Sequence, residues 1–213
     1  YSGKMCGSGA CRSESIRDEN TLMKDYLYVY MKEPSVRVLG PGNRYVLWVQ
    51  GCKKNCKGCV AASSHRMEDG TKISIGALAM EIALSDADGL TISGGEPFLQ
   101  AEELGSLVTQ IREIRPMGVI VYTGYRMEEL QADDRAADFL KKIDLLIDGE
   151  YIRELDDGKS LRGSSNQRVW ILTDKYRDYV SEYGTKERET EVFYHGIELH
   201  EIGIPKTISN RKE

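Results

Sequence analysis

The chain has 213 residues and a formal net charge of −5, and 30% of its residues are charged, with both signs represented. This balance lacks the basic patch that nucleic-acid binding needs, and no apolar stretch approaches the roughly 20 residues of a membrane span. Five cysteines are an odd number at low density, which is typical of thiols kept reduced. We therefore expect one cytoplasmic domain with protein or small-molecule partners, and no nucleic-acid or membrane partner.

The first 24 residues are rich in glycine, serine and charged side chains, and they carry Cys6 and Cys11. Such a composition predicts a flexible N-terminal extension over residues 1–24. Two thiols are too few to hold an iron–sulfur cluster alone, so ligands for a second cluster and a modified peptide segment both stay open as roles. A single domain is then expected over residues 25–206, with a C-terminal tail over residues 207–213.

From residue 26 onward, apolar runs alternate with amphipathic segments, which is typical of a parallel sheet with crossover helices. An edge strand is expected over residues 26–31 and a late strand pair over residues 192–204. The segment 176–189 is polar and is expected to be a surface helix or loop. The other predicted strands cover residues 45–50, 89–92, 119–122, 145–147 and 169–172.

Two helices are indicated by apolar residues spaced at i, i+3, i+4 and i+7, which place them on one helix face. The first pattern covers residues 75–82, with Ser74 as its expected N-cap. The second covers residues 104–111. A third crossover, over residues 126–130 and 136–142, is expected to be broken in the middle.

Three cysteines follow the apolar run 45–49 in a C-x3-C-x2-C pattern: Cys52, Cys56 and Cys59. A [4Fe-4S] cube normally takes four cysteines, so a cube held by these three keeps one iron open for a ligand that is not protein. The alternative is half of a zinc site, which needs a second ligand pair downstream. No cysteine follows Cys59, and the three histidines have no zinc-finger spacing. The spacing therefore favours a single cluster.

The second chemical signal is Gly94-Gly95-Glu96 followed by proline, at the carboxyl end of the strand predicted over residues 89–92. Two glycines at a strand end let backbone groups approach a ligand closely, and Glu96 could pair with an ammonium group. Ligands bind at this edge in α/β sheets. The alternative is a turn that only starts the next helix.

The cysteine triplet together with Gly94-Gly95-Glu96-Pro97 resembles the radical S-adenosylmethionine superfamily. The resemblance implies one [4Fe-4S] cluster held by Cys52, Cys56 and Cys59, with S-adenosylmethionine chelating the open iron through its amine and carboxylate. It implies that Gly94, Gly95 and Glu96 contact that amine. The fold it implies is α/β, a truncated (partial) TIM-like (β/α) barrel of the radical S-adenosylmethionine type.

Further stretches, over residues 119–125, 145–151, 161–168 and 203–205, look like the anaerobic ribonucleotide reductase activating proteins, and the resemblance covers residues 26–206. It implies a flavodoxin- or ferredoxin-type electron donor and reductive cleavage of S-adenosylmethionine to a 5'-deoxyadenosyl radical. The radical then takes a hydrogen atom from a glycine of a partner glycyl-radical enzyme. No side chain need act as a general acid or base, because the cofactor carries the chemistry.

The same resemblance suggests further cofactor contacts. Thr123 and Tyr125 are expected at the cofactor edge by analogy with loop-borne sites. Asn166, Gln167 and Arg168 would contact the adenosyl group or brace their own loop, and Arg162 could pair with Asp148. Gly58 and Val60 flank the third cysteine, where family members often have an aromatic residue and an asparagine after that cysteine. Val60-Ala61 departs from that pattern on the adenine side and leaves the target open.

Two alternatives to the activase stay open at this point. One is a radical S-adenosylmethionine maturase that modifies a ribosomal peptide or a small molecule. The other is a non-catalytic iron–sulfur carrier or sensor. The cysteine pattern fits all three, because it specifies the cluster and leaves the hydrogen donor open.

Overall fold

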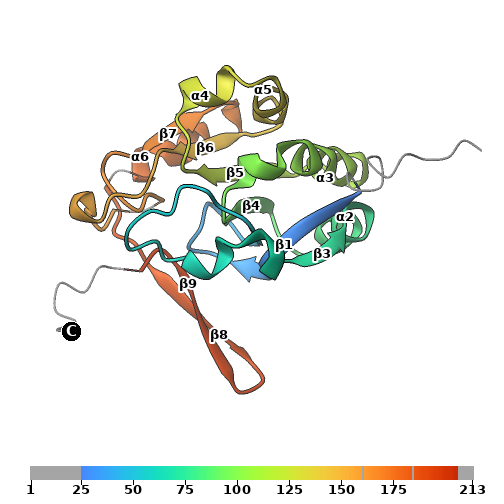
Figure 1. The fold of residues 1–213 in the computed structure, drawn as a ribbon, viewed down its shortest axis with the longest axis horizontal. Coiled ribbons are helices and arrows are strands. Elements are labelled where there is room, and N and C mark those ends of the chain that lie inside the picture. The colour runs from blue at the N-terminus through green and yellow to red at the C-terminus, as the bar shows by residue number, and fades with distance from the viewer. Residues whose placement is uncertain (1–24, 160, 184, 206–213) are drawn as a thin grey trace, which may run out of the picture.

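The computed structural model describes residues 25–159, 161–183 and 185–205 (Figure 1). The predictions for the N-terminal extension, with Cys6 and Cys11, and for the tail 207–213 lie outside these ranges. Within them, no helix combines the length and the apolar character needed to cross a bilayer.

The described strands form a seven-stranded sheet in the order β3-β1-β2-β4-β5-β6-β7 and a separate hairpin, β8-β9. The central strands β2, β4, β5 and β6 run parallel, whereas β1, β3 and β7 pair antiparallel with their neighbours. The strand bounds are β1 Tyr26–Val36, β2 Arg44–Val49, β3 Thr71–Ser74, β4 Gly89–Gly94, β5 Gly118–Thr123, β6 Leu145–Asp148, β7 Arg168–Ile171, β8 Thr190–His195 and β9 Glu198–Gly203.

Helices connect the parallel strands, and α3 packs between α2 and α5 on one face of the sheet (Figure 1). The α-helices are α2 Ile75–Leu84, α3 Ala101–Ile114, α4 Met127–Gln131, α5 Asp134–Leu140 and α6 Val180–Tyr183. Short 3-10 helices are η1 Ala62–Ser64, η2 Met67–Asp69, η3 Pro97–Gln100, η4 Arg153–Leu155 and η5 Asp174–Tyr179. Helix α3 has Glu102 and Glu103 in its first turn and Arg112 in its last turn, which complements its dipole.

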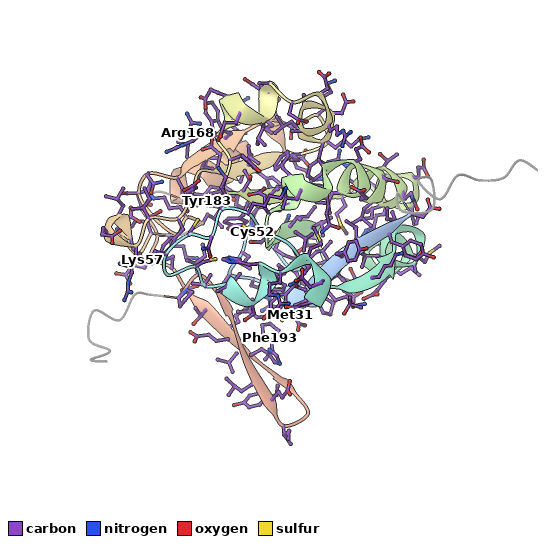
Figure 2. The ribbon with its side chains drawn as sticks, viewed as in Figure 1. Met31, Cys52, Lys57, Arg168, Tyr183 and Phe193 are labelled. Carbon is purple, nitrogen blue, oxygen red and sulfur yellow. The ribbon has the colours of Figure 1, made fainter. Side chains whose placement is uncertain are left out.

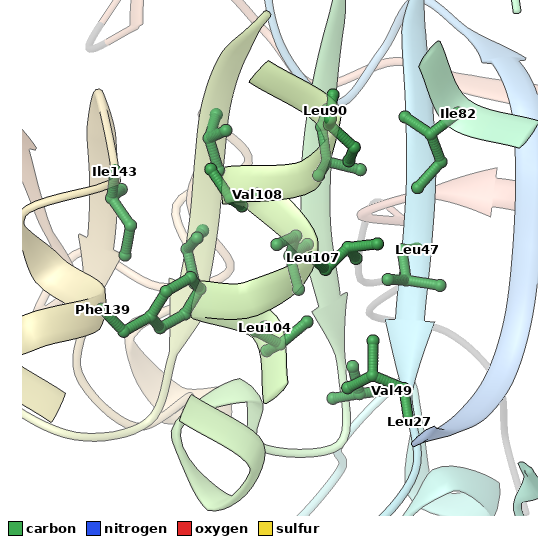
Figure 3. Close-up of a cluster of buried hydrophobic side chains, with 14 of the residues drawn as sticks. Leu27, Leu47, Val49, Ile82, Leu90, Leu104, Leu107, Val108, Phe139 and Ile143 are labelled. Carbon is green, nitrogen blue, oxygen red and sulfur yellow. The ribbon is translucent and has the colours of Figure 1, made fainter. Parts of the chain in front are cut away.

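The main core lies between the sheet and these helices. Figure 3 shows Leu104 and Leu107 of α3 beside Leu90 of β4 and Leu47 of β2, all fully buried. Each such leucine contributes about 2 kcal/mol through its removal from water. Alternate strand residues point to opposite faces of the sheet. A second cluster of buried hydrophobic side chains, which includes Ile120, therefore packs on the face opposite the main core.

The five strands predicted between residues 45 and 172 are confirmed to within two residues, with one difference of direction. Strand β7 runs antiparallel to β6, because residues 149–167 contain only the short η4 and lack the crossover helix that usually returns a chain for parallel pairing. The strand predicted over residues 26–31 is confirmed as part of β1, which continues to Val36. Its predicted edge position is wrong, because β1 lies between β3 and β2. The four-residue β3 was not predicted.

The three predicted helical regions and the late strand pair are confirmed. Ser74 holds the N-cap position of α2, but its side chain makes no capping hydrogen bond. The polar segment 176–189 is only partly on the surface, because Tyr176, Tyr183 and Arg188 are buried.

The sheet is open, with β3 and β7 at its edges, and the described residues form no closed barrel. The α/β prediction with a parallel centre is confirmed. Parallel strands bring their carboxyl ends to a common edge, so Val49 lies beside Gly94 in the register, and Thr123 lies beside Asp148. The loops that follow these four residues meet at that edge.

Candidate functional site

The loops after β2, β4, β5 and β6 border a cavity of about 510 Å³. All three cysteines of the C-x3-C-x2-C pattern line it, together with Gly94, Gly95 and residues of the later loops. The cavity therefore brings together the two motifs that the sequence singled out, although residues 60–93 separate them along the chain.

The cysteine loop curls because three of its residues adopt left-handed backbone angles: Gly51 at φ 98°, Asn55 at 51° and Gly58 at 79°. The cysteines are partly buried, whereas the lysines at positions 53 and 57 are exposed, and Figure 2 shows Lys57 at the periphery of the molecule and Cys52 inside it. The loop thus turns its thiols toward the cavity and the charges of Lys53 and Lys57 toward solvent.

The thiols influence one another. Burial raises the pKa of Cys56 and of Cys59, and the neighbouring thiols add to the rise. A positively charged group bound to all three sulfurs would relieve both effects, because it favours the thiolate form. The donor set therefore fits an iron–sulfur cluster.

Backbone hydrogen bonds join the cysteine loop to the glycine motif. The N–H of Gly95 donates to the carbonyl oxygen of Val49 at 2.8 Å, and the N–H of Glu96 donates to that of Gly51 at 2.7 Å. The N–H of Cys52 in turn donates to the carbonyl oxygen of His65 at 2.9 Å. The first cysteine is therefore fixed from both sides by backbone contacts.

The two glycines are explained by this close approach. A Cβ on Gly95 would lie 2.3 Å from the carbonyl oxygen of Gly51, and one on Gly94, at φ 100°, would lie 2.6 Å from the backbone nitrogen of Val49. Both contacts are with backbone, which cannot move aside as a flexible side chain can. The sequence indicated glycines that admit a ligand, and the structure adds that Gly94 admits the end of β2 and Gly95 admits the start of the cysteine loop.

Glu96 is buried and its carboxylate accepts three hydrogen bonds. Oε1 accepts from the hydroxyl of Thr123 at 2.7 Å and from the N–H of Phe98 at 3.1 Å, and Oε2 accepts from the N–H of Gly124 at 2.8 Å. Burial raises the pKa of this carboxyl, while the three hydrogen bonds and the nearby Lys54 act against the rise. Glu96 thus joins the ends of β4 and β5 and also lines the cavity.

The structure places some of the other predicted cofactor contacts in the cavity and others outside it. Gly58, Val60 and Thr123 line the cavity with Gly94, Gly95 and Glu96, whereas Tyr125 and Asn166 are not among its lining residues. The ring of Tyr125 lies under the ammonium of Lys54, 4.3 Å from the ring centroid.

The loop that contains Asn166 braces itself and the end of β6. The side-chain amide of Asn166 donates to the carbonyl oxygen of Glu150 at 2.9 Å, and that of Gln167 donates to Gly149 at 2.7 Å. Gln167 also lines the cavity. The suggested pair of Arg162 with Asp148 is wrong, because Arg168 pairs with Asp148 and Arg162 pairs with Asp157.

Several cavity residues were missed by sequence reasoning. Lys54 lies inside the cysteine loop, Tyr122 is the penultimate residue of β5, and Tyr151 lies in the loop after β6, so position near a strand end could have indicated all three. His65 carries no such signal, yet it also lines the cavity. The Nε2 atom of His65 and the hydroxyl of Tyr122 are buried without a hydrogen-bond partner among the described residues, so both are available to a bound group.

Among the described residues, no three or more His, Cys, Asp or Glu side chains are grouped closely enough to hold a single metal ion. A [4Fe-4S] cube distributes its cysteines over separate iron atoms, so its ligands need not converge on one point. The three thiols line one shared cavity, which fits that demand.

Comparison with known proteins places these features in a family. Residues 38–170 match the family model described as a 4Fe-4S single cluster domain. The chain is similar to the anaerobic ribonucleoside-triphosphate reductase-activating protein of Enterobacteria phage T4, at 36% identity over 143 residues, or 64% of this chain and 89% of the relative.

Bacterial proteins of the same name give the same result. The one from Haemophilus influenzae is 37% identical over 155 residues, or 68% of this chain and 96% of the relative. The one from Escherichia coli K12 is 35% identical over 147 residues, or 63% of this chain and 92% of the relative. The relatives are therefore matched over nearly their whole length, while about a third of this chain extends beyond the match.

Proposed function

We propose, from the premise that this chain belongs to the 4Fe-4S single cluster family of anaerobic ribonucleoside-triphosphate reductase-activating proteins, that it is a radical S-adenosylmethionine activase of a glycyl-radical reductase. The observation that carries the proposal is the shared cavity, which is lined by all three cysteines and by Gly94-Gly95. When bound there, the reduced [4Fe-4S] cluster and S-adenosylmethionine supply the radical that removes a hydrogen atom from carbon.

The residues that would hold the cluster are Cys52, Cys56 and Cys59. The loop that carries them is fixed by the backbone contacts of Gly51 and Cys52, which supports a site that is shaped before the cluster binds. Pre-organised ligands reduce the entropy lost on binding. The lysines of the loop, at positions 53 and 57, are exposed and would be accessible to an acidic electron donor of the flavodoxin or ferredoxin type.

The cofactor side of the proposal rests on Gly94, Gly95, Glu96 and Thr123. The absence of side chains at the two glycines leaves backbone groups accessible to the amine of S-adenosylmethionine. The carboxylate of Glu96 would add negative charge beside that amine, while Thr123 and Gly124 hold it in place by hydrogen bonds. Gly58 and Val60 would lie toward the adenine.

The open sheet supports a macromolecular substrate. A closed barrel would surround the cavity on all sides, whereas this sheet ends at β7 and does not close around it. The proposal has two further parts. The parallel strands are a partial TIM-like barrel, and the protein acts in the cytoplasm. A glycine loop of the reductase would enter without a side chain to obstruct it.

The test is anaerobic incubation of the cluster-loaded protein with reductant, S-adenosylmethionine and purified anaerobic ribonucleoside-triphosphate reductase. We expect 5'-deoxyadenosine and a glycyl-type doublet in the electron spin resonance spectrum. The control is a reductase whose radical-bearing glycine is replaced by alanine, which should give no doublet.

Two other outcomes would replace the proposal. Cleavage of S-adenosylmethionine without a radical on the reductase would favour a maturase of peptides or small molecules. No cleavage by a fully loaded cluster would favour an iron–sulfur carrier.

A further inference from the structure

The hairpin of β8 and β9 carries an apolar stripe on the face that points away from the sheet. Val192, Tyr194 and Leu199 lie on one side of it, because alternate strand residues share a face and Tyr194 is directly opposite Leu199 in the register. Tyr194 is 75% exposed and Leu199 is 58% exposed, and Ile197 in the turn is fully exposed. We refer to these four side chains as the hairpin stripe.

The base of the hairpin is anchored to the body. Ile202 is buried with Val36 and Val46, and Phe193 packs against the same cluster. The carboxylate of Glu191 accepts a hydrogen bond from the backbone N–H of Arg37 at 2.7 Å. Because Phe193 and Ile202 pack on the body from the opposite face at the base of the hairpin, the hairpin stripe points away from the body, and Figures 1 and 2 show the hairpin projecting from it.

The C-terminal end of the hairpin adjoins the cavity that the three cysteines line. Strand β9 continues directly into Ile204 and Pro205, and both line the cavity that contains the three cysteines. A macromolecule that inserts a loop into this cavity would therefore lie beside the hairpin. The family match ends at residue 170, so this element lies outside the matched domain.

The chemistry of the hairpin suits a protein partner. The exposed Glu201 lies at the edge of the hairpin stripe, on the same face and directly opposite Val192. An apolar patch with a charged rim is typical of a protein interface, and a tyrosine at its centre is a frequent anchor. The complementary surface is an apolar groove with a basic rim.

We propose that the hairpin stripe docks the glycyl-radical reductase, in an apolar groove with a basic rim, and holds its glycine loop at the mouth of the cysteine cavity. This inference rests on the proposed function, because it takes the reductase as the substrate. It assigns to residues 190–203 a role in affinity for the partner, separate from the cluster and S-adenosylmethionine.

The test compares two double variants of the full chain. Tyr194→Ser with Leu199→Ser removes the centre of the hairpin stripe. Met80→Ser with Leu84→Ser removes similarly exposed apolar side chains from α2, where they are 50% and 72% exposed. Each protein is assayed for reductase binding, for the glycyl radical yield, and for S-adenosylmethionine cleavage without reductase.

We expect the hairpin variant to bind the reductase at least about tenfold more weakly, as the loss of an interface anchor does. Its radical yield should fall at low reductase concentration and recover at high concentration, while cleavage without reductase stays at the wild-type rate. The α2 variant should match wild type in all three assays.

Equal binding by wild type and the hairpin variant would overturn the docking role and leave the proposed function intact. A hairpin variant that loses self-association in sedimentation, with unchanged reductase binding, would also overturn it, since the occupant is then a second copy of the chain. If wild type itself neither binds nor activates the reductase, the proposed function fails, and the docking role fails with it.

Discussion

The ammonium of Lys54 lies 3.0 Å from a carboxylate oxygen of Glu150, and it also lies over the ring of Tyr125. Lys54 belongs to the cysteine loop, whereas Tyr125 and Glu150 follow the ends of β5 and β6. The hydrogen bond to Glu150 and the surrounding negative charges raise the pKa of Lys54, although partial burial acts in the opposite direction. One side chain thus fastens the cysteine loop across the cavity.

Replacing Lys54 with methionine should loosen the cysteine loop before any cluster is present. An ion pair of this exposure and a cation–π contact together contribute about 1 kcal/mol, so amide hydrogen exchange of residues 52–59 in the cluster-free protein should speed up about fivefold. Lys54→Arg should retain most of the protection, because the guanidinium can make both contacts.

The matched control is Lys57→Met, which changes an exposed lysine of the same loop and should leave the exchange rates unchanged. Identical exchange in Lys54→Met and wild type would mean that the loop is held by its backbone contacts alone.

Replacing any one of Cys52, Cys56 and Cys59 by alanine should abolish both the cluster and the cleavage of S-adenosylmethionine. A cube with two protein ligands has lost a bond that the remaining thiols cannot replace. Iron content and 5'-deoxyadenosine formation measure the two effects. The control replaces Cys6 and Cys11 together, and iron should stay at about four per chain. Full cleavage by a Cys52→Ala protein would exclude the assignment.

The central part of the fold and the composition of the site could be predicted because both depend on local pattern. Apolar runs of strand length locate β2, β4, β5 and β6, and their parallel order follows from the helices between them. Once those strands are parallel, the residues after Val49 and after Ile92 must meet at one edge. The contact between the cysteine loop and Gly94-Gly95 follows from that rule.

Other features depend on contacts between distant segments, which local pattern does not specify. The direction of β7 is decided by the lack of a crossover helix after β6, in a loop whose sequence is polar and irregular. Ile204 and Pro205 line the cavity, and their position depends on how the hairpin packs on Val36 and Val46. Arg168 and Arg162 are equally able to pair with Asp148 by sequence, and only their places in the loop distinguish them.

Gly95→Ala should damage the cluster as well as S-adenosylmethionine binding. The new Cβ would lie 2.3 Å from the carbonyl oxygen of Gly51, so the cysteine loop must shift at a cost of about 1–3 kcal/mol, the range for overpacking. Urea unfolding of the cluster-free protein, iron content after reconstitution and cofactor binding should all decrease.

Gly76→Ala is the matched control, because this glycine lies in α2 and a Cβ there would meet only one side-chain atom, at 3.6 Å. It should stabilise the protein by about 0.5–1 kcal/mol, since alanine favours the helix. If Gly95→Ala weakened cofactor binding and left iron content and stability at wild-type values, the glycine would serve the ligand alone.

Asp148 should make the stability of the protein depend on pH. Its side chain is fully buried at the end of β6, where Oδ2 accepts from the N–H of Met127 at 2.7 Å and Oδ1 accepts from Nε of Arg168 at 3.0 Å. Burial alone would raise the pKa of Asp148, but the hydrogen bonds from Arg168 and Met127 outweigh it and hold that pKa below its ordinary value.

A lowered pKa in the folded state means that the unfolded chain binds the proton more tightly. The stabilisation is therefore complete above the unfolded pKa of about 3.9 and is lost as the pH falls through the folded pKa. Urea unfolding of the cluster-free protein between pH 7 and pH 2 should report this loss. Asp148→Asn should lower the free energy of unfolding by about 1–3 kcal/mol at pH 7, because it leaves buried donors poorly paired. It should also make that free energy depend less on pH on the acid side.

The control is Glu128→Gln, which removes an exposed carboxylate that contacts the same Arg168. It should change the free energy of unfolding at pH 7 little, because solvent screens that pair. Parallel profiles for Asp148→Asn and wild type would mean that other carboxylates control the acid limit of this fold.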